Sequence, residues 1–177
     1  MLQRCAVLIA FALSATGSAI AQTPAFAQAT WRAFAPEGVG YSIEMPGEWT
    51  LQSEEVRARG GTMKITVATV RAGRNAYITI HSRHPEAGVL PAAQVLDGAR
   101  DGAVANVKGK LRKEDAILVS DLPGREFIID APNGLVAISR IFLLDNKLVQ
   151  AMAAGPVMVL AEPDTRRFLD SLKVADR

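Results

Sequence analysis

The chain has 177 residues, of which 20 are basic and 18 are acidic, so its net charge at pH 7 is +2. This near balance argues against a general nucleic-acid binder, because such proteins carry a marked basic excess. Beyond the N-terminal segment, no apolar run approaches the roughly 18 residues of a membrane-spanning helix. The single cysteine, Cys5, has no partner for an internal disulfide.

The N-terminal segment has the pattern of a secretory signal peptide. Arg4 precedes an apolar run over residues 5–13, and small residues follow up to Ala19-Ile20-Ala21. A basic start, a short apolar stretch and an A-x-A ending are the three parts of a cleavable signal. We therefore expect export to the periplasm and cleavage after Ala21, which would also remove Cys5. A second A-x-A site lies at residues 25–27.

Cleavage can be checked by the intact mass of protein recovered from the periplasm. We expect a mature chain that starts at Gln22 or Gln28. A soluble product that retains Met1 would contradict the predicted export.

Residues 22–33 are rich in Ala, Gln and Thr and are expected to form a flexible lead-in. Residues 34–177 have the length of one domain. A mature chain of 156 residues buries about 70% of its unfolded surface. We therefore predict that it folds without disulfides or a structural metal.

The first half of this domain shows the two-residue periodicity of strands. Tyr41, Ile43 and Met45 alternate with polar residues, and a Pro-Gly turn leads to residues 49–51. Residues 62–67 and 76–80 have the same pattern around a connection that contains Gly73. These segments predict three to four antiparallel strands.

A helix is predicted after Pro91, because proline suits the first turn of a helix. Its apolar residues recur at helical spacing, whereas its charged residues lie on the other side. The predicted buried stripe is Ala92, Leu96, Ala99, Ala103 and Val107, widened by Val95 and Val104; the exposed side holds Asp97, Arg100 and Asp101.

The second half predicts four further strands, at residues 117–120, 126–130, 135–144 and 147–153, joined by hairpins. Asn133-Gly134 and Asp145-Asn146 tolerate the positive φ angles of tight turns. The strand 135–144 is apolar on both faces, which predicts a central position. A short helix is expected from Pro163. The predicted fold class is α+β, a mainly antiparallel sheet of about six to seven strands with two helices packed on it, and its core is expected to bury Trp49, Phe142 and Phe168.

Over residues 34–174 the sequence resembles the PsbP-like α/β sandwich. The matching segments are Phe34-Ala35-Pro36-Glu37-Gly38 with Tyr41 to Pro46, Leu122 to Glu126, Arg140 to Leu143, and Phe168 to Val174. This fold occurs in lumenal photosystem proteins and in uncharacterised exported bacterial proteins. The resemblance implies the fold, and by analogy an accessory or assembly role, because fold similarity alone does not transfer an activity.

The segment His81-Ser82-Arg83-His84-Pro85-Glu86 holds both histidines of the chain. Two imidazoles and a carboxylate are suitable ligands for zinc or copper, so His81, His84 and Glu86 are a candidate metal or small-ligand site. Strand alternation places His81 on a sheet face and His84 in the following loop. Two exposed loop residues are the simpler interpretation.

No constellation of catalytic residues is apparent, so we predict no catalytic residues and no cofactor. The mature chain has no cysteine, no G-x-S-x-G elbow and no phosphate-binding G-x-x-x-x-G-K loop. The carboxylate pairs at residues 54–55 and 114–115 could do acid–base chemistry if buried. Exposed turns are the more ordinary interpretation.

A basic cluster follows the predicted helix and could contact an anionic partner or lipid headgroups. It comprises Lys108, Lys110, Arg112 and Lys113. A second set of cations, Arg57, Arg59, Lys64, Arg71 and Arg74, is expected on the first hairpin. The alternative is a solvated sheet edge that prevents strands from pairing between molecules.

Three functional hypotheses follow from the sequence. The first is a periplasmic, non-enzymatic binding or accessory protein that contacts another envelope protein. The second is a metal or small-ligand site around His81, His84 and Glu86. The third is attachment to an anionic surface through the basic hairpin. Glu126 is also expected to pair with Arg140 across the turn at residues 133–134.

Overall fold

The computed structural model describes residues 30–58, 61–83 and 88–174. Its centre is a seven-stranded sheet in the order β3-β4-β5-β9-β8-β7-β6, in which all neighbours are antiparallel. The strands are β3 (Thr50–Ala58), β4 (Gly61–Ala72), β5 (Asn75–Arg83), β6 (Lys110–Val119), β7 (Leu122–Asp130), β8 (Leu135–Leu144) and β9 (Lys147–Pro156). The predicted sheet of six to seven antiparallel strands is confirmed.

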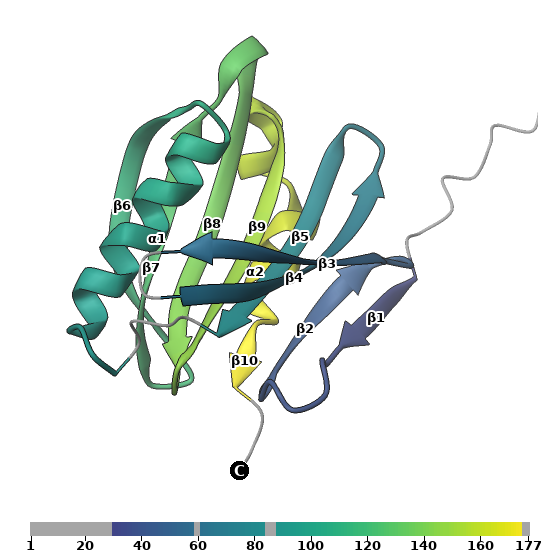
Figure 1. Cartoon of the computed structure of the whole chain (residues 1–177). Coiled ribbons are helices and arrows are strands. Elements are labelled where there is room, and N and C mark those ends of the chain that lie inside the picture. Colours follow the sequence, from purple (N-terminus) through teal and green to yellow (C-terminus); the bar gives the residue numbers. More distant parts are fainter. Residues whose placement is uncertain (1–29, 59–60, 84–87, 175–177) are drawn as a thin grey trace, which may run out of the picture.

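Each face of this sheet is covered by a different layer (Figure 1). Helix α1 (Ala92–Asn106) packs on one face, against β7 and β8. The other face is covered by α2 (Pro163–Asp170) and by a small sheet in the order β1-β2-β10. These short strands are β1 (Trp31–Phe34), β2 (Tyr41–Pro46) and β10 (Lys173–Val174). The result is a layered α+β sandwich with two helices.

The larger core lies between the sheet and the layer that contains β2 and α2. Tyr41, Tyr77, Phe142 and Phe168 are at most 1% exposed there. A smaller core lies beneath α1, where Leu96 packs with apolar residues of β7 and β8. Two cores form because the central strands present apolar side chains to both faces.

Strand β8 shows this arrangement directly. Its register with β9 pairs Ile138 with Ala153 and Phe142 with Val149, and both pairs belong to the larger core. The alternate position Ile141 belongs to the smaller core under α1. The predicted bounds and the two apolar faces of this strand are confirmed.

Several local predictions need correction. Strand β1 begins at Trp31, so regular structure starts within the segment predicted to be a lead-in. Strands β3 and β6 are longer than predicted, because exposed edge strands carry few apolar residues. Trp49 is only partly buried, and Ala92 is exposed rather than part of the buried stripe of α1. Phe142 and Phe168 are fully buried as predicted.

The predicted pair of Glu126 and Arg140 is confirmed. These residues lie opposite each other on β7 and β8, and Arg140 Nε lies 2.7 Å from Glu126 Oε2. Arg140 also donates to the carbonyl of Leu169 at 2.9 Å and pairs with Asp170 at 2.8 Å. Because the last carbonyls of a helix lack intrahelical partners, this arginine attaches the end of α2 to the sheet.

None of the helices in the described segments is long and apolar enough to cross a membrane. This agrees with the expectation from the sequence for the part of the chain that the structure describes.

Candidate functional site

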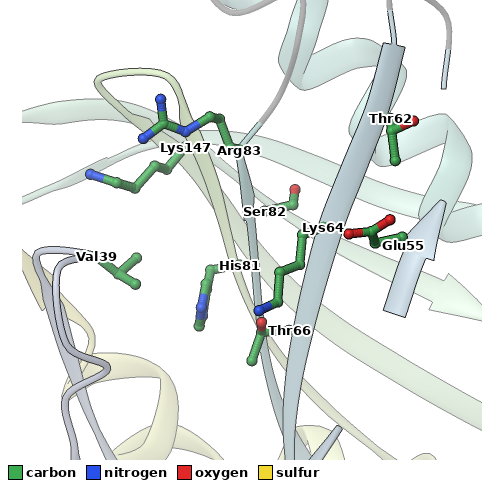
Figure 2. Close-up of a pocket in the computed structure, with 9 residues that line it drawn as sticks. All are labelled: Val39, Glu55, Thr62, Lys64, Thr66, His81, Ser82, Arg83 and Lys147. Atoms are coloured by element: carbon green, nitrogen blue, oxygen red, sulfur yellow. The ribbon is translucent and has the colours of Figure 1, made fainter. Parts of the chain in front are cut away.

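A pocket of about 680 Å³ opens at one end of the sheet, beside the loop that precedes β2 (Figure 2). Pockets of 300–1,000 Å³ are typical of small-molecule sites. Its lining comes from β3, β4, β5, the start of β9 and that loop, and comprises Val39, Glu55, Thr62, Lys64, Thr66, His81, Ser82, Arg83 and Lys147.

The pocket exists because three neighbouring strands change from apolar to polar in the same direction along one sheet face. On β5 this face carries Tyr77, Thr79, His81 and then Arg83. On β4 it carries Val70, Ala68, Thr66 and then Lys64, and on β9 it carries Ala151, Val149 and then Lys147. The strand register aligns these gradients, since Thr66 pairs with His81 and Arg83 pairs with Lys147. The polar end of the face is therefore the place where the apolar core stops.

His81 is oriented by the buried side chain of Tyr41. His81 Nδ1 lies 3.2 Å from Tyr41 Oη, and Tyr41 Oη lies 2.9 Å from Thr79 Oγ1. Thr79 in turn donates to the carbonyl of Gln150 at 3.2 Å. Tyr41 and Thr79 are at most 1% exposed, so the chain of hydrogen bonds leads from the pocket into the core.

The three hydrogen bonds can form at the same time in only one arrangement of protons. The Thr79 hydroxyl has a single proton, which it donates to Gln150, so it can only accept from Tyr41. Tyr41 thereby uses its own proton and must accept from His81 Nδ1. In that arrangement a neutral His81 carries its proton on Nδ1 and leaves a free electron pair on Nε2.

Burial sets the charge states of these two rings. Burial raises the pKa of Tyr41 to about 12, so Tyr41 stays protonated. Burial lowers the pKa of His81 below its ordinary value, and the positive charge of Lys64 lowers it further. His81 is therefore neutral at neutral pH.

The charges that line the pocket are mostly positive. Among the described lining residues, Lys64, Arg83 and Lys147 contribute three cations, whereas Glu55 is the single carboxylate. Glu55 lies opposite Lys64 in the β3–β4 register and is exposed. Within the described segments, none of the three cations forms an ion pair within 4.0 Å. The pocket thus presents an uncompensated positive charge that suits an anion.

The candidate metal site is only partly visible. His81 lines the pocket, whereas His84 and Glu86 lie outside the described residues. Among the residues that the structure does describe, no group of three His, Cys, Asp or Glu could hold a metal ion. The metal site at His81, His84 and Glu86 therefore stays a prediction.

The basic cluster after α1 lies on and just before the edge strand β6. In the strand order of the sheet, β8 and β7 separate β6 from β9, the nearest strand that lines the pocket. Arg112 Nε donates to Asp130 at 3.1 Å, and Lys113 pairs with Asp115 at 2.6 Å. Lys108 and Lys110 are exposed. Two of its four charges thus have acidic partners, which weakens this cluster as an anion site.

The carboxylate pairs do not form a site. Glu54 and Glu55 occupy successive positions of β3 and so point to opposite faces of the sheet. The same holds for Glu114 and Asp115 on β6. Glu114 instead binds Arg100 of α1 and Arg125 of β7 (both at 2.7 Å), a contact between layers that the sequence did not predict.

Comparison with known proteins informs the fold. No family model matches the sequence, and no curated protein matches it. The solution structure of cyanobacterial PsbP (CyanoP) from Synechocystis sp. PCC 6803 has a TM-score of 0.56 at 11% identity, covering 88% of this chain and 98% of that one. The fold is PsbP-like. A protein of unknown function from Pseudomonas aeruginosa, described as a putative regulator, has a TM-score of 0.46 at 10% identity, covering 83% and 99%.

At such identities the likeness establishes the fold and no more. In this chain, β2 and α2 cover the sheet face that ends at the pocket. The PsbP-like architecture leaves the choice of ligand to the residues of this chain.

Proposed function

We propose that this chain is a periplasmic, non-enzymatic binding protein, and that it binds a small anionic ligand in the pocket beside His81. The observation that carries this proposal is the convergence of Lys64, Arg83 and Lys147 on one concave site without ion-pair partners in the described segments. Export through the signal pattern of residues 1–21 supports the compartment.

The pocket favours a small ligand over the other two sequence-based hypotheses. Lys64 and Arg83 are exposed, so their ammonium and guanidinium groups are open to a ligand. Thr62 and Thr66 add hydroxyl groups that can donate hydrogen bonds to an oxyanion. Val39 provides a buried apolar wall. A concave site with a few convergent polar groups is typical of ligand binding.

Binding can be tested by isothermal titration calorimetry with inorganic phosphate and with citrate, at pH 7.5 and constant ionic strength. We expect both anions to bind, and Lys64→Gln to weaken binding about tenfold, because a hydrogen bond to a charged group contributes about 1.5–3 kcal/mol. Lys147→Gln should have a similar effect. Binding should also weaken as salt is added, since exposed charges are screened.

Lys110→Gln is the matched control, because Lys110 is exposed on β6 and its substitution changes the net charge equally. It should leave the affinity within about twofold of the native value. If neither anion binds the native chain, or if Lys110→Gln weakens binding as much as Lys64→Gln, the proposed site is wrong.

A further inference from the structure

The pocket combines two recognition elements of opposite hydrogen-bonding character. Lys64, Arg83 and Lys147 can only donate hydrogen bonds, because ammonium and guanidinium groups have no free electron pair. When the chain through Tyr41 and Thr79 holds the ring proton on Nδ1, His81 Nε2 can only accept one. A ligand that satisfies both elements needs an anionic group and a hydrogen-bond donor.

The acceptor is open to the pocket. His81 is partly exposed and lines the cavity, and its Nδ1 is occupied by Tyr41. In the described segments, no hydrogen-bond partner of His81 Nε2 is present. The atom is also not one of the fully buried polar atoms that lack a partner there, so it is not sealed inside the core. As far as the described residues go, Nε2 is therefore open to a ligand or to water.

The cations lie in two groups around His81 in the pocket. Figure 2 shows the ammonium end of Lys64 beside Thr66, with His81 between this pair and Val39. Arg83 and Lys147 lie at the other end of His81 in the same view. All three cations and the imidazole line the same pocket.

The donor must be uncharged. Lys64 is close enough for its charge to lower the pKa of His81. A ligand ammonium group that approached Nε2 would meet the same positive charge, so amino acids and polyamines are disfavoured. A hydroxyl group can donate to Nε2 without this repulsion.

We infer that the ligand is a hydroxylated oxyanion, such as a hydroxycarboxylate, a sugar acid or a sugar phosphate. The cations bind its anionic group, and His81 Nε2 accepts a hydrogen bond from its hydroxyl. This inference rests on the proposed function, and it specifies the ligand class of the same pocket.

Matched ligand pairs that differ by one hydroxyl group test the inference. Calorimetry at pH 7.5 would compare malate with succinate, and glycerol 3-phosphate with propyl phosphate. The hydroxylated member of at least one pair should bind roughly three- to tenfold more tightly, the range of one neutral hydrogen bond. The two pairs distinguish a carboxylate from a phosphate as the anionic group.

Two variants assign this preference to the imidazole. His81→Phe keeps an aromatic ring but removes the acceptor, so it should bind both members of a pair equally. Tyr41→Phe keeps the imidazole but removes the hydroxyl that fixes its tautomer, so the preference should fall to about twofold or less. Circular dichroism melts would confirm that both variants are folded.

The tautomer can also be measured without a ligand. The chain has only two histidines, so long-range ¹H–¹⁵N NMR spectra are simple, and His81→Phe assigns the His81 signals. We expect His81 to be protonated on Nδ1 and unprotonated on Nε2 in the native protein. In Tyr41→Phe the proton should redistribute toward Nε2.

The outcomes separate this inference from the proposed function. Equal affinities within both pairs, or a proton found on Nε2 in the native protein, would overturn the hydroxyl recognition while anion binding stands. The absence of binding by all four probes would overturn the anion site itself.

Discussion

Phe142→Ala is expected to lower the free energy of unfolding by about 3–5 kcal/mol, the usual cost of truncating a core phenylalanine. Phe142 is 0% exposed and lies on β8, the strand that pairs with both β7 and β9. Its partner in the β7–β8 register is Gly124, where a Cβ would lie 2.6 Å from the carbonyl oxygen of Ile141 and 3.3 Å from Phe142 Cβ. Removal of the ring leaves a cavity that the surrounding strands can close only in part.

Urea unfolding followed by circular dichroism measures this loss. Leu118→Ala is the matched control, because Leu118 is 70% exposed on the edge strand β6 and its truncation should cost less than about 0.5 kcal/mol. A loss below about 1 kcal/mol for Phe142→Ala would mean that the larger core is not built around β8.

Glu114→Gln is expected to cost about 2 kcal/mol, because it leaves two guanidinium groups without their shared carboxylate. Arg100 and Arg125 each lie 2.7 Å from Glu114, and all three side chains are less than a quarter exposed. Asp97 of α1 stays bound to Arg125 at 2.7 Å, so the loss is smaller than for a fully buried pair. The exposed Glu54→Gln on β3 is the matched control and should change stability by less than about 0.5 kcal/mol.

This contribution should depend on pH in a defined direction. Burial raises the pKa of Glu114, but hydrogen bonds from Arg100 and Arg125 and their charges outweigh it, so the pKa in the folded protein lies below the ordinary value of 4.5. Because folding lowers this pKa, the ionised carboxylate stabilises the folded state fully at pH values above its pKa in the unfolded chain. This stabilisation is lost as the pH falls through its pKa in the folded protein.

The difference between the native chain and Glu114→Gln should therefore be constant from about pH 6 to 7 and shrink below pH 4.5. Urea unfolding at several pH values measures it. A difference that grows toward low pH would contradict the assigned ion pairs.

Much of the fold follows from local patterns in the sequence. The two-residue alternation at Tyr41, Ile43 and Met45 predicts β2, and the apolar run of β8 predicts its central place. Asn133 and Gly134 take the positive φ angles of 61° and 71° that their turn requires. Such signals are readable because backbone geometry repeats over neighbouring residues.

The candidate site was predictable only in part. His81 stood out because the chain has two histidines close together, but the metal hypothesis paired it with residues outside the described segments. Lys64 was predicted as one of the cations of the first hairpin, whereas Lys147 carried no local signal, since isolated lysines on strands are common surface residues. The change from apolar to polar residues along each strand was visible in the sequence. The sequence did not show that strand pairing places these polar ends side by side.

What the sequence by itself determined is most of the strands, both helices, the turns between them and the α+β class, because these depend on residues within a few positions of one another. The tertiary structure alone decided the strand register, the Glu114 ion pairs and the pocket. Tyr41 and His81 are 40 positions apart, and Arg83 meets Lys147 only when β5 pairs with β9. Such contacts arise from the choice of strand partners, which depends on how the whole apolar surface is buried.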